Sequence, residues 1–180
     1  LGKMVILGLG FGMGADKFTA SCEQRNIKID RAFAEKVVQL YRNRFPLIKN
    51  QWYAQENAAI QACLLPGKEV KEGRIAWKKI NRFLYCKLPS GRCLAYCDPD
   101  VREGMTPGGE PKPQLFFKSV VAETKQWVEG STYGGSIVEN ITQAIARDLL
   151  AEAIKNCEKN GYFVVMHTHD ETVAEVPDSF

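Results

Sequence analysis

Residues 161–177 read Gly161-Tyr-Phe-Val-Val-Met-His-Thr-His-Asp-Glu-Thr-Val-Ala-Glu-Val-Pro177. Two segments rich in β-branched and aromatic residues flank the polar group His169-Asp170-Glu171, and Gly161 and Pro177 mark the ends. This pattern predicts an antiparallel hairpin over 161–177 with Asp170 and Glu171 in its tight turn. Because both predicted strands are apolar, we expect a sheet to bury them and to leave the acidic tip in a cleft.

The two adjacent carboxylates in this turn repel each other. A divalent cation relieves that repulsion, and carboxylate oxygens are ligands that suit Mg²⁺. Asp170 and Glu171 are therefore the candidate metal ligands of the chain. The alternative is a turn that is acidic only because turns are hydrated.

Size and composition predict an ordinary globular protein. The chain has 180 residues, of which 45% are hydrophobic, and no apolar run is long enough to span a bilayer. The six cysteines form no CxxC pair, which favours a reducing compartment and buried, inert thiols. A zinc site built from Cys86, Cys93 and Cys97 stays open as an alternative. Since no initiator methionine stands before Leu1, we expect an excerpt of a longer protein.

Charge is unevenly distributed along the chain, although the net charge is only +3. Residues 68–92 contain eight basic and two acidic residues, a net charge of +6. The last twenty residues contain four acidic residues and no Lys or Arg, a net charge of −4. A basic surface beside an acidic cleft is what a protein needs to bind a phosphate backbone next to a metal site. A solvated basic face without a partner is the alternative.

The first fifteen residues allow two interpretations. In one, Val5-Ile6-Leu7 is a strand, Gly10-x-Gly12-x-x-Ala15 is a dinucleotide-binding turn, and Asp30 ends the next strand. In the other, the segment is a glycine-rich helix in which Lys3, Leu7, Phe11 and Ala15 share one face. Taken alone, the segment fits the nucleotide turn better.

The chain after Asp30 favours the helical interpretation, because a Rossmann fold needs strands that alternate with helices. Asp30 predicts an N-cap for a helix over 31–44, and Pro46 predicts the start of a second helix that Pro66-Gly67 ends. Their predicted apolar faces are Phe33, Val37, Leu40 and Tyr41, and then Ile48, Trp52, Ala59, Ile60 and Cys63.

The second half of the chain predicts a hairpin over 82–97, with its turn at Pro89-Ser90-Gly91, and then a loop over 98–114. Arg92 stands just past that turn, where it can reach a phosphate. The longest helix is expected over 132–159. Its predicted apolar face is Val138, Ile141, Ile145, Leu149 and Ala153, and another face carries Glu139, Gln143 and Arg147. Gln143 and Arg147 are able to donate to bases and phosphates.

Four segments together resemble family A DNA polymerases of the bacteriophage and prophage type. Lys3…Leu7…Phe11-Gly12 resembles motif B, the mobile fingers helix, and residues Tyr133–Leu150 resemble the long helix that follows the fingers. Val165-Met-His-Thr-His-Asp-Glu171 resembles motif C of the palm, and Leu88-Pro-Ser-Gly-Arg92 matches the phage branch. The order and spacing fit across nearly the whole chain.

The resemblance implies a role for each matching residue. Asp170 is implied as a ligand of catalytic Mg²⁺, with Glu171 beside it. Lys3, Leu7 and Phe11 are implied at the incoming nucleotide and the template base. DNA contacts are implied for His169, Gln143 and Arg92. The implied activity is that of a DNA-directed DNA polymerase, which adds deoxynucleotides to a primer 3′ end by two-metal phosphoryl transfer.

The resemblance also sets expectations for the organisation of the chain. An α+β fold is expected, with a mainly helical fingers-like region over 1–130 and a palm-like region over 131–180 that holds part of an antiparallel sheet. Motif A, which supplies the second metal-binding aspartate in the family, is absent from the sequence, so we expect the isolated chain to be inactive. Primer–template DNA and deoxynucleoside triphosphates are the expected partners, no membrane is expected, and the expected location is the bacterial cytoplasm.

Three other functions remain as alternatives. The segment 5–30 suggests an NAD(P)-binding oxidoreductase, and the basic segment suggests a nucleic-acid-binding module without catalysis. His167-Thr-His169 is similar to the HxH pair of some metallohydrolases. Such sites need further histidines, and the chain contains only two.

Overall fold

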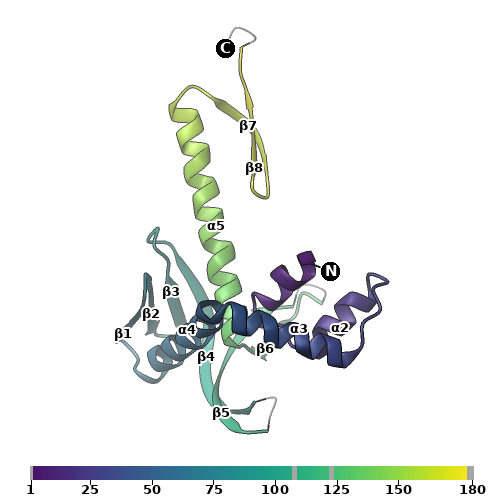
Figure 1. The fold of residues 1–180 in the computed structure, drawn as a ribbon. Coiled ribbons are helices and arrows are strands. Elements are labelled where there is room, and N and C mark those ends of the chain that lie inside the picture. The colour runs from purple at the N-terminus through teal and green to yellow at the C-terminus, as the bar shows by residue number, and fades with distance from the viewer. Residues whose placement is uncertain (1, 107–108, 122–123, 178–180) are drawn as a thin grey trace.

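The computed structural model describes residues 2–106, 109–121 and 124–177. These residues form an α+β fold with five α-helices, one π-helix, a six-stranded antiparallel sheet and a separate hairpin (Figure 1). The predicted α+β class is confirmed, whereas the assignment of its parts to fingers and palm stays a prediction. The six-stranded sheet is larger than the isolated hairpins that the sequence suggested.

The N-terminal part is helical, which contradicts the nucleotide-binding interpretation. Helix α1 (Gly2–Met4) continues directly into the π-helix η1 (Val5–Leu9), so no strand precedes the glycines. The helical segment ends at Leu9 instead of reaching Ala15, because Gly12 adopts a φ of +82° that a right-handed helix cannot contain. Phe11 therefore lies in the turn after the helix and not on its face.

Three further helices complete this part of the chain. They are α2 (Ala15–Glu23), α3 (Arg31–Arg44) and α4 (Pro46–Leu64). Both predicted starts are confirmed, since the Asp30 carboxylate accepts a hydrogen bond from the Phe33 N–H at 2.6 Å and Pro46 occupies the first turn of α4. Helix α3 buries Ala34, Val38 and Tyr41, so its buried face is rotated from the predicted one and leaves Leu40 exposed.

The six strands follow one another in the sheet in the order of the sequence. They are β1 (Glu69–Glu72), β2 (Ile75–Ile80), β3 (Phe83–Lys87), β4 (Cys93–Met105), β5 (Pro111–Val120) and β6 (Trp127–Ser131). The predicted hairpin over 82–97 is confirmed as β3 and β4, with Gly91 at a φ of +89° in its turn. The six strands are antiparallel throughout.

The predicted loop over 98–114 is wrong, because β4 and β5 pair through most of it. Two of the prolines that suggested a loop occupy positions that a strand tolerates: Pro99 lies at the register shift between Cys97 and Asp100, and Pro111 is the first residue of β5. Pro113 lies inside β5, where it pairs with Glu103, and Pro107 lies outside the described residues. The ladder between β4 and β5 resumes at Asp100, directly after Pro99.

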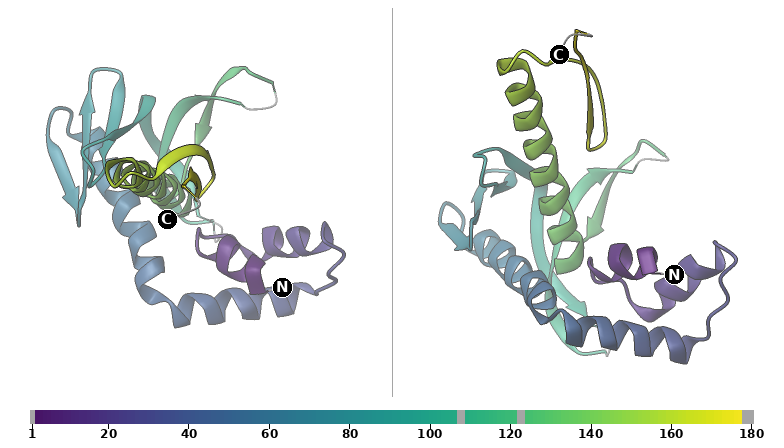
Figure 2. Two further views of the ribbon diagram at one scale, coloured as in Figure 1. Left: turned by 90° about the horizontal axis from the view of Figure 1, so that it is seen from above. Right: turned by 45° about the horizontal axis from the view of Figure 1, so that its top comes forward.

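One face of the sheet packs against α4 and α5 (Gly134–Lys159), the longest helix (Figure 2). Trp77, Leu84, Cys86 and Leu115 are fully buried in this core. Helix α5 contributes Ile137, Ile141 and Ala144 to this core. The predicted apolar face of α5 is therefore right for Ile141 and wrong for Leu149, which is 67% exposed. A second cluster holds the N-terminal helices together through Leu9, Phe18, Cys22, Ala34, Val38 and Tyr41.

The thiols fit the expected inert role where they are buried. Cys22, Cys63 and Cys86 are buried and free, whereas the expected burial is wrong for Cys93, which is exposed. Burial raises the pKa of Cys63 to about 11 and that of Cys86 to about 12. No helix in the described ranges combines the length and the apolar character that crossing a membrane requires.

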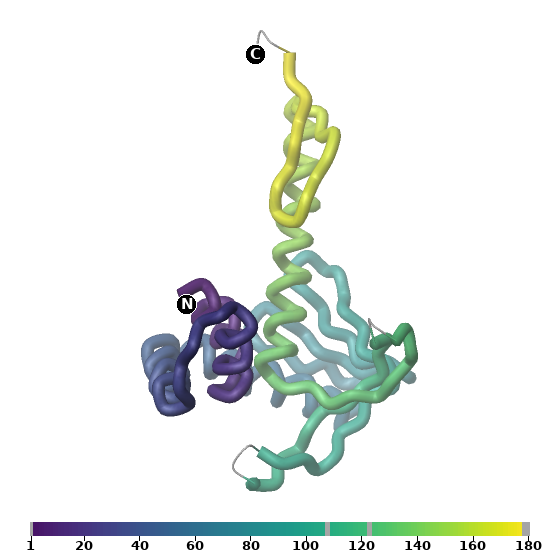
Figure 3. Tube along the Cα trace, turned by 90° about the vertical axis from the view of Figure 1, so that its right-hand side faces the viewer, coloured from purple at the N-terminus to yellow at the C-terminus, as the bar shows by residue number. Residues whose placement is uncertain are grey.

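The C-terminal hairpin is confirmed as β7 (Phe163–Thr168) and β8 (Glu171–Glu175). Its expected burial in a larger sheet is wrong for the described residues, because the two strands pair only with each other. Val165 and Met166 are more than half exposed. The hairpin runs back alongside α5, and its tip points toward the body of the molecule (Figures 1 and 3).

Candidate active site

A cleft between α5 and the β7–β8 turn gathers three of the predicted site residues. Gln143 lies on α5, and His169 and Asp170 form the turn; all three line the same cleft of about 690 Å³. Arg147, one helical turn after Gln143, lines it as well. Residues from separate segments therefore present an amide, an imidazole, a carboxylate and a guanidinium to one space.

The turn is displaced by one residue from the prediction. Thr168 pairs with Glu171, so the two turn residues are His169 and Asp170, and Glu171 begins β8. His169 has a φ of +49°, a left-handed conformation in which histidine is found more often than most residues. The side chain of Glu158 accepts a hydrogen bond from the Val164 N–H at 2.7 Å, which ties β7 to the end of α5.

The acidic pair has no third candidate metal ligand beside it in the described part of the chain. Asp170 and Glu171 are exposed carboxylates, and their oxygens are the kind of ligand that Mg²⁺ prefers. Across the described ranges, no three His, Cys, Asp or Glu side chains gather in the way that a metal site needs. This finding also gives no support to the zinc alternative at Cys86, Cys93 and Cys97 or to the metallohydrolase alternative.

Lys3, Leu7 and Phe11 lie on a different part of the surface. Lys3 and Leu7 line a hollow of about 280 Å³ together with Arg25. Leu7 and Phe11 also line a hollow of about 530 Å³, whose opposite wall includes Val138 and Thr142 of α5. Neither hollow includes His169 or Asp170.

The N-terminal segment and α5 meet at close range, a contact that the sequence analysis missed. A side-chain carbon on Gly135 would overlap the carbonyl group of Phe11, and one on Gly134 would overlap the backbone of Trp52. Trp52 is buried, as predicted, and its indole N–H donates to the carbonyl oxygen of Gly10 at 2.9 Å. The small residues at the start of α5 therefore allow Phe11 to lie against the helix.

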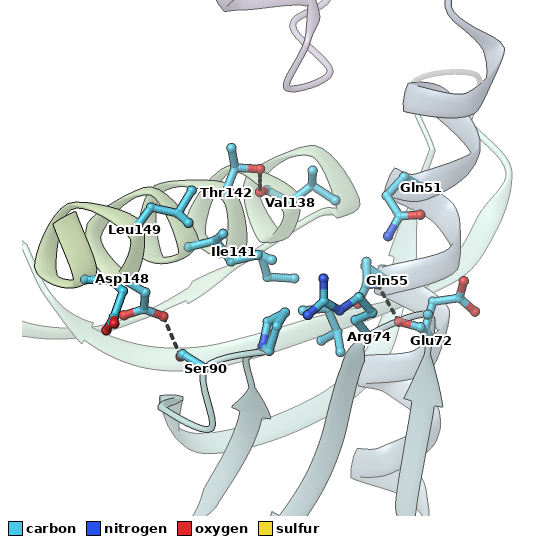
Figure 4. Close-up of a pocket in the computed structure, with 15 residues that line it drawn as sticks. Gln51, Gln55, Glu72, Arg74, Ser90, Val138, Ile141, Thr142, Asp148 and Leu149 are labelled. Carbon is cyan, nitrogen blue, oxygen red and sulfur yellow. Dashed lines mark hydrogen bonds between the residues drawn. The ribbon is translucent and has the colours of Figure 1, made fainter. Parts of the chain in front are cut away.

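Arg92 contacts α5 through its guanidinium. Its Nε donates to Asp148 at 2.6 Å and its Nη2 donates to the carbonyl oxygen of Ala144 at 2.7 Å. The hydroxyl of Ser90 also donates to Asp148, at 2.6 Å (Figure 4). The Ser90 hydroxyl and then Arg92 lower the pKa of Asp148 below its usual value. The β3–β4 turn is thereby fixed to the middle of α5.

A groove of about 730 Å³ opens beside this contact, between α5, α4 and the β1–β2 and β3–β4 turns. Figure 4 shows Asp148 and Ser90 at one end and Gln51 and Glu72 at the other. Asp148 is a residue to which the sequence analysis gave no role, because its partners lie more than fifty residues away in the chain.

Comparison with known proteins finds a phage protein that is similar to nearly the whole of this chain. The DNA polymerase of Bacillus phage SP02 is 34% identical over 177 residues, which are 98% of this chain and 26% of that protein. The chain thus spans about a quarter of the length of the relative that it matches. No protein-family model and no solved structure matches the chain. Over nearly its whole length, the chain is a distant homologue of part of a phage DNA polymerase.

Proposed function

We propose that this chain is part of a DNA-directed DNA polymerase of family A, comprising the fingers and part of the palm. The support is the 34% identity to a phage DNA polymerase over 98% of the chain. Two of the resembling segments, residues 133–150 and 165–171, line one cleft, and the segment 3–12 packs against the start of the same helix. The oxidoreductase alternative loses its basis because residues 2–9 are helical.

The proposed reaction adds a deoxynucleotide to the 3′ end of a primer. When bound, Mg²⁺ stabilises the attacking and the leaving oxygens in such a transfer. Asp170 and Glu171 are the residues of this chain that would hold it, and the resemblance implies that a second aspartate comes from motif A. Their exposure leaves both carboxylates accessible to a cation.

The other residues bind and position the substrates in this proposal. Gln143 and Arg147 point donors at the primer–template duplex, and His169 contacts the primer strand near its reacting end. Lys3 binds the phosphates of the incoming nucleotide, where a positive charge offsets the developing negative charge. Leu7 and Phe11 border the nucleotide and the template base. The resemblance implies that Arg92 meets the nucleic-acid backbone, and its guanidinium also donates to the carbonyl oxygen of Ala144 in α5.

The cleft that joins Gln143, His169 and Asp170 is the observation that carries the proposal. Its test is the affinity of the purified chain for primer–template DNA, measured by fluorescence anisotropy. We expect Gln143→Ala to weaken binding about fivefold, since one hydrogen bond contributes about 1 kcal/mol. Gln61→Ala, on the exposed surface of α4, is the matched control and should bind like the original chain. Equal binding by all three proteins would contradict the proposal.

Synthesis is tested separately. The purified chain should not extend a primer in the presence of Mg²⁺ and nucleotides, because the described residues place no third His, Cys, Asp or Glu beside Asp170 and Glu171 to complete a metal site. In a polymerase that contains the whole region, Asp170→Ala should abolish synthesis and leave DNA binding within about twofold, because a metal ligand acts on the chemical step. Retained synthesis in that variant would remove Asp170 from the site.

A further inference from the structure

The face of the sheet that points away from α4 and α5 carries a distinct set of side chains. Val70, Trp77 and Cys86 pair across β1–β3 and point into the core. Because side chains alternate along a strand, their neighbours point to the opposite side. The outward rows on these strands are Lys71–Ala76–Lys87 and Glu69–Lys78–Tyr85, with Phe83 further along β3.

A basic hollow lies at one end of this face, beside the β1–β2 and β3–β4 turns. It measures about 340 Å³ and is lined by Lys71, Lys87 and Arg74, the last of which also lines the groove beside α5 (Figure 4). The register places Ala76 between Lys71 and Lys87, where a small side chain leaves room between two cations. Glu69 is the acidic residue of the lining, and it pairs with Lys71 at 3.3 Å. In the described part of the chain, Arg74 and Lys87 form no ion pair and no side-chain hydrogen bond.

An aromatic pair continues from the hollow along β3. Phe83, Tyr85 and Lys87 stand at intervals of two residues along β3, so all three side chains lie on the same face. The ring centroids of Phe83 and Tyr85 are 5.9 Å apart, and the two ring planes form an angle of 39°. Lys78 and Ala95 flank Tyr85 on the neighbouring strands, so a cation stands on one side and a small residue on the other.

We propose that this outward face of β1–β3 binds single-stranded DNA, with backbone phosphates at the basic hollow and bases stacked on Tyr85 and Phe83. Uncompensated cations beside aromatic rings match a chain that alternates phosphates and bases. A single strand fits better than a duplex, because only unpaired bases offer their faces to an aromatic ring. The inference rests on the proposed function in one respect, that DNA is the polymer bound. The surface itself is separate from the α5 cleft.

The test uses the purified chain and a fluorescent oligonucleotide of about 15 thymidines, a length near the upper end of known single-strand site sizes. Anisotropy gives the affinity at several salt concentrations. We expect Tyr85→Ala to weaken binding about tenfold with an unchanged salt dependence, since stacking involves no charge. Lys87→Ala should weaken binding and reduce the slope of log K against log salt by about 0.7, the value for one phosphate contact on a single strand.

Two matched variants control for general effects. Tyr53→Ala removes a half-exposed tyrosine from α4, and Lys36→Ala removes an exposed lysine from α3. Both should bind the oligonucleotide like the original chain. Circular dichroism should show that all four variants fold, because each side chain points out of the core.

Three results would overturn the proposal. The first is unchanged oligonucleotide binding by Tyr85→Ala. The second is equal binding of polyglutamate, which would assign the face to acidic proteins. The third is competition by inorganic phosphate: if millimolar phosphate at constant ionic strength abolishes oligonucleotide binding, the hollow is a site for free phosphate. Primer–template binding by Gln143→Ala is measured in parallel. If that variant is impaired and Tyr85→Ala is not, this inference fails and the proposed function stands.

Discussion

At the scale of single residues, the guanidinium of Arg92 is held between Asp148 and the carbonyl oxygen of Ala144. Two roles for Arg92 make opposite predictions for the variant Asp148→Asn. If Arg92 binds a phosphate, loss of the neighbouring negative charge should strengthen DNA binding. If Arg92 instead positions α5 for DNA, loss of the Asp148 charge should weaken DNA binding. We expect weaker binding, because both contacts fix the guanidinium on the helix.

The measurement is the affinity for primer–template DNA as a function of salt. In the positioning role, Arg92→Ala lowers the affinity and leaves the slope of log K against log salt unchanged, whereas loss of a phosphate contact reduces the slope by about 0.9. Asp16→Asn, an exposed acidic residue in the first turn of α2, is the control. Tighter binding by Asp148→Asn would contradict the positioning role.

The surroundings of two carboxylates predict that the stability of the fold depends on pH. Hydrogen bonds from Arg82 and Lys118 lower the pKa of Asp98 below its usual value, and Ser90 and Arg92 do the same for Asp148. A pKa that is lower in the folded state means that the unfolded state binds more protons in acid. The stabilisation is therefore complete above the unfolded pKa of about 3.9 and is lost as the pH falls below it.

We expect the melting temperature to fall as the pH is lowered below about 4 and to fall less steeply in Asp98→Asn. Thermal melts followed by circular dichroism at constant ionic strength measure both proteins. Parallel pH profiles for the two would show that Asp98 does not contribute.

At the scale of elements, the start of α5 and the turn after η1 depend on each other. Ala normally stabilises a helix by about 1 kcal/mol relative to Gly. At Gly135 the added carbon would overlap the backbone of Phe11, which cannot move away as a flexible side chain can. We therefore expect Gly135→Ala to lower the free energy of unfolding by about 1–3 kcal/mol, as overpacking does.

Urea denaturation checks this prediction. Gly130→Ala is the matched control, because nothing lies within 4 Å of a carbon added there. A Gly135→Ala variant as stable as the original chain would show that the two segments separate easily.

The sequence predicted elements where the signal was local. Asp30 and Pro46 fixed two helix starts, and Pro89-Ser90-Gly91 fixed a turn. It failed where tertiary packing decides. Leu149 fits the apolar repeat of α5, yet the sheet contacts the face of Ile137, Ile141 and Ala144 instead. The contacts of Asp148 were beyond prediction, because they join residues 56 and 58 positions apart.

At the scale of the whole molecule, the described residues form two hydrophobic clusters. One joins η1, α2 and α3 around Phe18, and the other joins α4, α5 and the sheet around Trp77 and Leu84. Helix α4 links them, since Ile48 packs against the first cluster and Ala59 belongs to the second. The predicted division at residues 130 and 131 stays a prediction. The first half of α5 shares its core with the sheet.

This arrangement predicts that the two clusters open separately. Phe18→Ala removes a fully buried ring and should destabilise the first cluster by about 3–5 kcal/mol. Because structural units open with their own free energies, hydrogen exchange should accelerate within residues 2–44 and stay unchanged in β2–β4. Leu84→Ala, equally buried in the second cluster, should accelerate exchange in β2–β4. Equal acceleration throughout the chain in both variants would mean that α4 couples the clusters into one cooperative unit. Movement of the N-terminal helices relative to the sheet would then require unfolding of the whole chain.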